Sequence, residues 1–310
     1  MAPTAQRSFN THTTYDSLTR KYTIVAADYP ILGVDSLWES TINDGVNETK
    51  PVTANLLLAH PDASPNNPGS IAISRILTGP SQRTFAIFTD GSIHEIDVKA
   101  AKYSKLGNLF EKTSLTNGVV TDAHVVDGLT LKSFVSDESK NVYLIKTEIT
   151  DSGITISAPV PIKASWRSFN WEHETPIAAH MISMHDGMEP KLVVVLAGDF
   201  DQINWIDEDT GVMDPLVSNL YDFSTGVSPI FECTLSTKDC DFWRTSAYDA
   251  EKRMLYFQAH AVDSEDIHST TILQMGFTQN KVTKLWYPYV NQAIWPMNFG
   301  YSGYQFVSLK

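Results

Sequence analysis

The sequence predicts an all-β protein, a single β-propeller domain spanning residues 1–310 with about six four-stranded blades. Three observations predict it: a turn-and-strand unit recurs along the chain, a second hairpin follows the unit, and no segment combines a 3.6-residue apolar period with helix-capping residues. The composition agrees, because charged residues make up only 19% of the chain while aromatic residues, which strands favour, reach 11%.

The recurring unit is clearest where two distant segments match. Residues 15–26 and 248–259 both begin with Tyr-Asp and carry Arg and Ala at the same later offsets. The Asp opens a turn by accepting hydrogen bonds from backbone amides just ahead of it, and an apolar strand follows. Weaker copies complete a series of turn anchors at residues 16, 79, 137, 186, 249 and 298. Their spacing fits blades of about 40–50 residues with long inserted loops.

The second halves of the units also read as hairpins. Asp90-Gly91 separates apolar strands over 84–89 and 92–98, and Asp209-Thr210-Gly211 marks a similar turn. Each unit then supplies an inner and an outer hairpin. A β-sandwich holds only about seven to nine strands, so the chain would have to form two of them. The sixth unit reaches Lys310 after its inner hairpin. Five blades are therefore the alternative, and closure of the ring between the termini stays open.

The hairpin pattern, over most of the chain, resembles the superfamily of irregular propellers that includes the YncE-like and senescence-marker lactonase-like proteins. The Trp-Asp, double-Gly and Tyr-Trp-Thr-Asp signatures of other propeller classes are absent. The resemblance to the lactonase-like members implies a divalent cation such as Ca²⁺ in the central channel, held by one Glu with Asn and Asp residues from separate blades. Glu172, Asn170 and Asp199 are residue types that could serve.

The net charge of the chain limits the classes of partner that it can bind. A net charge of −13 argues against nucleic acid, which needs clustered Lys and Arg, and against adhesion to anionic membranes. No apolar run approaches the ~18–20 residues of a membrane helix, so we expect no membrane insertion. The remaining partners are a small molecule, a glycan or a protein, and we expect a monomer.

The repeat predicts which face carries the function. Turns inside the inner and outer hairpins lie on one face, and the connections between hairpins and between blades lie on the other. The long connections are of the second kind, which makes that face the functional one. They are expected at residues 60–70, 111–128, 163–176 and 221–243.

The third of these loops is dense in groups that stack on a ligand or hydrogen-bond to it. The predicted ligand-binding residues are Trp166, Arg167, Asn170, Trp171 and His173, with a second Trp-Arg pair at Trp243 and Arg244. The alternative interpretation is structural: the aromatic residues seal the blade edges, and the Arg residues bridge neighbouring blades.

Metal and catalytic candidates are weaker, because no established metal or catalytic motif is present. His260, Asp263 and Asp266 in one loop, and Asp199 and Asp201 in another, could contribute to a cation site or could be solvated acidic turns. A loop histidine, His124, lies between Asp122 and Asp127 and could act as a general base, with Glu172 as the second catalytic candidate.

These observations favour a secreted or surface-associated propeller that binds a small molecule, glycan or protein. The alternative is a metal-dependent hydrolase or lactonase that uses carboxylates in the channel. A disulfide between Cys233 and Cys240 would imply an oxidising, extracellular compartment, whereas two free thiols would not.

Overall fold

The computed structural model describes residues 8–16, 21–28, 36–43, 53–59, 73–78, 83–88, 90–97, 100, 102–111, 113–115, 117–150, 153–165, 171, 174–198, 202–217, 239–262 and 268–297. The described residues form strands β1 to β22 and no helix, which confirms the all-β prediction. No helix capable of spanning a bilayer is found in this part of the chain.

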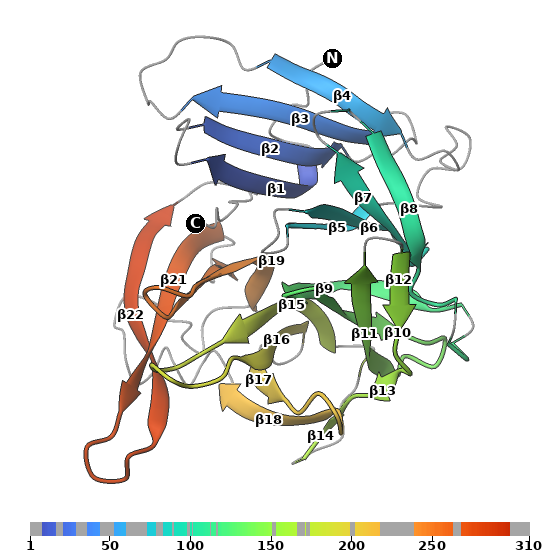
Figure 1. The fold of residues 1–310 in the computed structure, drawn as a ribbon. Helices are drawn as coiled ribbons and strands as arrows, with labels where there is room; N and C mark the ends of the chain where they lie inside the picture. Colours follow the sequence, from blue (N-terminus) through green and yellow to red (C-terminus); the bar gives the residue numbers. More distant parts are fainter. Residues whose placement is uncertain are drawn as a thin grey trace. The chain divides into compact units, whose positions relative to one another are not determined.

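The strands form five sheets, which belong to two compact units with a boundary after Pro159 (Figure 1). The first unit holds three of them, each an antiparallel series of strands that are neighbours in sequence. Sheet 1 contains β1 (Ser8–Asp16), β2 (Lys21–Asp28), β3 (Ser36–Asn43) and β4 (Thr53–Ala59). Sheet 2 contains β5 (Ile73–Thr78), β6 (Thr84–Phe88), β7 (Ser92–Asp97) and β8 (Lys102–Asn108). Sheet 3 contains β9 (Val119–Asp127), β10 (Thr130–Ser136), β11 (Val142–Thr150) and β12 (Gly153–Ile156).

The second unit begins with two short strands and holds the other two sheets. The short strands are β13 (Val160–Pro161) and β14 (Lys163–Ala164), and β14 pairs in parallel with the outer strand of sheet 4. Sheet 4 contains β15 (Glu174–Ile182), β16 (Lys191–Gly198), β17 (Gln202–Ile206) and β18 (Val212–Val217). Sheet 5 contains β19 (Asp239–Asp249), β20 (Met254–Val262), β21 (His268–Gln279) and β22 (Trp286–Met297).

The first strands of successive sheets lie beside one another within each unit. In the first unit β1 lies beside β5, and β5 beside β9; in the second unit β15 lies beside β19. The first strand of each sheet is therefore the inner strand, and the last is the outer edge. Four-stranded sheets arranged in this way are the blades of a propeller.

Several predicted turns are confirmed. Asp209-Thr210-Gly211 joins β17 to β18, the two outer strands of sheet 4. Asp90-Gly91 also forms a turn, but it lies between β6 and β7, the second and third strands of sheet 2, and not inside the outer hairpin. The turns anchored at Asp186 and Asp249 join the two inner strands of sheets 4 and 5. The four-stranded unit was thus predictable from the spacing of polar turns.

The prediction for sheet 3 was wrong by one strand. The turn at Asp137 joins β10 to β11, which are the second and third strands, because β9 lies inside the stretch 111–128 that was predicted as a loop. A bulge in β9 shifts the register between Ser133 and Val135 of β10. Because a bulge interrupts the two-residue alternation, β9 does not have the sequence pattern of a strand.

Two other predicted loops are shorter than expected. Sheet 5 begins at Asp239, so the end of the stretch 221–243 belongs to β19. Likewise β14 and the start of β15 take up both ends of the stretch 163–176. Loop length was overestimated because polar residues also occupy these strand ends.

Apolar residues of adjacent sheets form the core of each unit. In the first unit, Phe85, Ile87 and Ile93 of sheet 2 pack with Leu131 and Ile145 of sheet 3. All of these side chains are buried. Each contributes about 1.5–3 kcal/mol by leaving water, so this interface supplies much of the stability of the unit.

In the second unit a buried cluster joins sheets 4 and 5, and polar contacts accompany it. The Tyr248 hydroxyl donates to the Ser183 carbonyl at 2.6 Å, and Nε2 of His180 lies 2.7 Å from Oγ of Ser246. Burial raises the pKa of Tyr248, so the hydroxyl remains a donor.

Five sheets match the five-blade alternative. The sixth unit, anchored at residue 298, lies outside the described residues, as does Cys233. Closure between the termini, the single domain and the disulfide therefore stay predictions.

Candidate functional site

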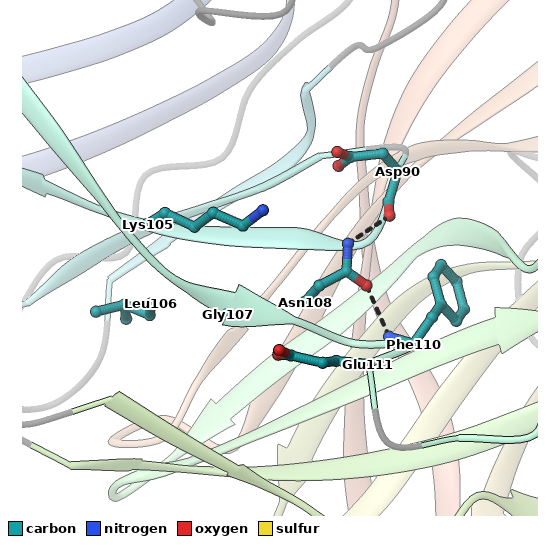
Figure 2. A pocket seen from close by; sticks show the side chains of 7 residues that line it. All are labelled: Asp90, Lys105, Leu106, Gly107, Asn108, Phe110 and Glu111. Carbon is teal, nitrogen blue, oxygen red and sulfur yellow. Dashed lines mark hydrogen bonds between the residues drawn. The ribbon is translucent and has the colours of Figure 1, made fainter.

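A hollow of about 690 Å³ opens at one end of sheet 2, where the β6–β7 turn meets the connection that leaves β8 (Figure 2). The connection that leaves β8 is of the kind predicted to form the functional face. The β6–β7 turn was predicted as a turn inside a hairpin, but in the structure it connects the second and third strands, so it lies on the same face. The hollow is lined by Asp90, Lys105, Leu106, Gly107, Asn108, Phe110 and Glu111.

Asn108, the last residue of β8, holds the two connections together. Its Nδ2 donates to the Asp90 carbonyl at 2.8 Å, and its Oδ1 accepts from the Phe110 amide at 2.8 Å. The Leu109 amide also donates to the Gly91 carbonyl at 2.8 Å. Because these bonds use both ends of the Asn108 amide, its role here is to shape the hollow (Figure 2).

Phe110 fits against two glycines. A Cβ on Gly91 would lie 2.5 Å from Cδ2 of Phe110, and a Cβ on Gly118 would lie 2.3 Å from its Cε1. Gly91 also has a φ of +82°, a backbone angle that residues other than glycine rarely adopt. The ring therefore forms a fixed part of the wall.

Three charged side chains line the hollow. Oδ1 of Asp90 accepts from the amide and the hydroxyl of Ser92, at 2.8 and 2.6 Å, which closes the turn. Lys105 and Glu111 are exposed. In Figure 2 the Glu111 carboxylate points toward Gly107, whereas the Lys105 side chain extends along the strand toward Asn108. Within the described residues, none of these three groups forms an ion pair.

This arrangement can bind a polar molecule. One ammonium and two carboxylates offer strong hydrogen bonds, while Leu106 and Phe110 offer apolar contact. In the described part of the chain, no group of three or more His, Cys, Asp or Glu could hold a metal ion.

The predicted general base, His124, lies on β9 and not in a loop. His124 is only 3% exposed, and it pairs in register with Ser133 on β10. Asp127, one of its two predicted carboxylate neighbours, pairs instead with Lys132 at 2.9 Å. His124 is therefore placed in the interior of the first unit, away from solvent.

Most of the predicted ligand-binding residues lie outside the described residues. These are Trp166, Arg167, Asn170 and His173, together with the catalytic candidate Glu172. Trp171 is half-buried in a turn, whereas Trp243 and Arg244 belong to β19 and not to a loop.

The predicted metal ligands are similarly placed. His260 lies on β20, and Asp199, Asp201, Asp263 and Asp266 lie outside the described residues. A cation site in these loops stays a prediction.

The prediction did not include Lys105 and Glu111. Two signals pointed to their surroundings: the Asp90-Gly91 turn, and the start of the loop at Glu111 on the same side of the unit. Neither could show that β8 brings Lys105 beside them, because that depends on the pairing of β7 with β8.

Comparison with known proteins shows the fold alone. No family model and no curated protein matches the chain. The catalytic domain of the GH62 α-L-arabinofuranosidase of Coprinopsis cinerea is similar in structure, with a TM-score of 0.52 and 13% identity, over 91% of this chain and 89% of that one. The D158A mutant of a Cellvibrio cellulosa α-L-arabinanase gives a TM-score of 0.42 at 10% identity, over 92% and 96% of the two chains. The WD40 β-propeller domain of Doa1 gives 0.39 at 10% identity, over 93% and 82%.

The strand order and the GH62 similarity define the class of protein: the chain has a β-propeller fold. At 13% identity this likeness carries no activity or substrate with it.

Proposed function

We propose that this protein is a ligand-binding propeller that holds a small polar molecule, such as one sugar unit of a glycan, in the hollow beside the Asp90–Gly91 turn. The observation that carries the proposal is a preformed hollow with charged groups that are not paired with one another. We also propose that the protein acts outside the cell or at its surface, as the pair Cys233 and Cys240 would favour.

The rigidity of the hollow supports binding. Asn108 and the glycines around Phe110 fix the wall before any ligand arrives, so binding does not have to order the backbone. Lys105 and Glu111 keep their hydrogen-bonding capacity for a ligand that has hydroxyl, carboxylate or amine groups.

The test is a thermal-shift screen against glycans and polar metabolites, followed by calorimetry with each hit. Lys105→Ala and Glu111→Ala should each weaken binding about 10- to 100-fold, because a hydrogen bond to a charged group is worth about 1.5–3 kcal/mol. Lys102→Ala is the matched control: Lys102 is an exposed lysine on the same strand that does not line the hollow.

Two results would contradict the proposal. One is a screen in which no compound raises the melting temperature. The other is a ligand whose affinity is unchanged by both substitutions in the hollow, since that ligand would bind elsewhere.

The second candidate function is a hydrolase, and a buried carboxylate favours it. Glu174 is 2% exposed and begins β15, the inner strand of sheet 4. Its register partner is Gly198, which directly precedes the predicted metal ligand Asp199. The resemblance to lactonase-like propellers implies a metal in the central channel, held by one Glu with Asn and Asp residues from separate blades. In this second proposal the chain is a member of that group and Glu174 supplies the Glu.

The hydrolase proposal is tested by metal analysis and by activity on lactones and arabinose-containing glycans. We expect a bound divalent ion and turnover that Glu174→Gln lowers by at least about 100-fold, because the isosteric amide cannot carry the charge. Glu148→Gln, an exposed carboxylate on β11, is the control. A metal-free, inactive wild-type protein that gains no thermal stability from Ca²⁺, Mn²⁺ or Zn²⁺ would rule this proposal out.

A further inference from the structure

The turn between β21 and β22 presents apolar side chains to water. Residues 278–285 are all exposed, with Val282 at 88% and Leu285 at 58%. Lys281 and Lys284 flank Val282, and neither forms an ion pair within the described residues. Two exposed apolar side chains beside two unpaired lysines form what we call the tip, residues 280–285.

The tip is an ordered turn. Oδ1 of Asn280 accepts from the amides of Val282 and Thr283, at 2.9 and 3.0 Å. The Lys284 amide donates to the Asn280 carbonyl, and the Asn280 amide donates to the Leu285 carbonyl, both at 2.9 Å. The backbone bonds are thus satisfied within the turn, which holds Val282 and Leu285 in the solvent.

Sheet 4 contains the same turn with the opposite charge. In the β17–β18 turn, Oδ1 of Asp207 accepts from the amides of Asp209 and Thr210, and the Gly211 amide donates to the Asp207 carbonyl. Gly211 has a φ of +69°, and Lys284 at the matching position has +59°. The sequence Asp-Glu-Asp-Thr-Gly-Val in sheet 4 becomes Asn-Lys-Val-Thr-Lys-Leu in the tip. Identical backbone bonding shows that the turn geometry does not require the lysines or the exposed valine.

The charge of the chain is unevenly distributed around this feature. All 36 acidic residues precede residue 267, so neither β21, β22 nor the tip carries a carboxylate. Gly276–Gln279 pair with β22 and not with β20, which places the tip on a two-stranded ribbon about 14 Å long at ~3.4 Å per residue. Against the net charge of −13, the tip itself carries two positive charges. The β15–β16 turn beside this end of the ribbon carries Asp186 and Glu189, of which Asp186 forms an ion pair with Arg253.

We propose that the tip docks on an anionic lipid surface. Its lysines would approach the headgroups while Val282 and Leu285 enter the boundary of the acyl chains. The ring of Trp286, the first residue of β22, stacks on His185 with centroids 4.9 Å apart, which fixes the ribbon to the β15–β16 turn. A lipid surface suits a site this small, because six residues offer far less than the ~800 Å² that each partner buries in a stable protein interface.

The test grafts the turn of sheet 4 onto the tip by Asn280→Asp, Lys281→Glu, Val282→Asp, Lys284→Gly and Leu285→Val. Wild type and variant are sedimented with vesicles of phosphatidylcholine alone, or with about one third phosphatidylserine. Wild type should bind the phosphatidylserine vesicles and lose binding as salt rises. The graft should bind at least about 30-fold more weakly, since each lysine near an anionic surface contributes about 1 kcal/mol.

The graft uses a turn that this chain already folds, and circular dichroism checks that it does so here. Lys140→Gln is the matched control, since Lys140 is another exposed lysine with positive φ in a turn, and it should bind as wild type does. The proposal is overturned if the wild-type protein does not bind phosphatidylserine vesicles, or if the graft binds them as tightly as wild type does. Binding to soluble polyglutamate without binding to vesicles would also overturn it, by assigning the tip to an acidic protein.

Discussion

At the residue scale, the pair of Arg83 and Glu95 shows how one interaction sets a local charge state. Nε of Arg83 donates to Oε1 of Glu95 at 2.7 Å, and Nη2 donates to Oε2 at 3.0 Å. The guanidinium also lies 5.4 Å from the ring centroid of Phe85. The hydrogen bonds from Arg83 lower the pKa of Glu95, and they outweigh burial, which alone would raise it.

Glu95→Gln should destabilise the protein by about 0.5–1 kcal/mol near neutral pH, the usual range for a partly exposed pair. Because the folded state lowers the pKa, the contribution is present above the ordinary pKa of a glutamate and is lost as the pH falls through the lowered value. Urea unfolding at a series of pH values checks this. The two proteins should converge in acid, and a constant difference down to the lowest pH would contradict the assignment. Glu148→Gln, which removes no ion pair among the described residues, should change little.

Residue roles were the least predictable part of the site. His124 was predicted as a general base because two aspartates flank it in sequence. In the structure it is buried on β9, and Asp127 pairs with Lys132. Lys105 has no sequence signal, because its position depends on the register of β7 with β8. Side-chain direction on a strand follows from pairing, which a single segment of sequence does not contain.

At the element scale, the packing of Phe110 against two glycines determines the wall of the hollow. Gly118 requires no positive φ, so its role is purely steric: there is no room for a methyl group beside the ring. Gly128 is the opposite case, with a φ of +62° and no atom within 4 Å of the place that a methyl group would take. A substitution at Gly118 therefore tests steric crowding alone, and one at Gly128 tests backbone strain alone.

Gly118→Ala should therefore destabilise the protein by about 1–3 kcal/mol and weaken binding in the hollow, because the ring must move. Gly128→Ala should cost about 1 kcal/mol through its backbone and leave binding unchanged. Denaturation and calorimetry measure both effects. Adding Phe110→Leu to Gly118→Ala should restore part of the lost stability, and a double variant that is no more stable than Gly118→Ala would show that the ring is not the obstacle.

Elements were predictable where a turn has strong sequence preferences. Asp-Gly at residues 90–91 located the turn between β6 and β7, since a turn this short needs a residue with positive φ, which Gly91 supplies. The sequence did not reveal β9, because a bulge and polar residues break its alternation. The turn at Asp137 was found but assigned to the wrong pair of strands for the same reason.

At the scale of the whole molecule, the repeat predicted the fold class but gave no information about the ligand. Four strands per unit follow from local patterns repeated along the chain, and the GH62 similarity confirms the propeller. The hollow and the tip depend instead on departures from the repeat. One is the connection after β8, and the other is the replacement of an acidic turn by a basic and apolar one. Such departures can be recognised only after the repeat has been aligned on the structure.

The order of strands within the sheets also has a consequence for how the chain reaches its native state. In sheets 1, 2, 3 and 5, each described pairing along the series of four strands joins strands that are adjacent in sequence. Such local pairings close short loops, which favours rapid formation of each sheet on its own. During synthesis the amino-terminal sheets can therefore assemble while later ones are still being made. Sheet 4 is the exception, because β14 can pair only after β18 has been made. Among the described strand pairings within a unit, this one closes the longest loop.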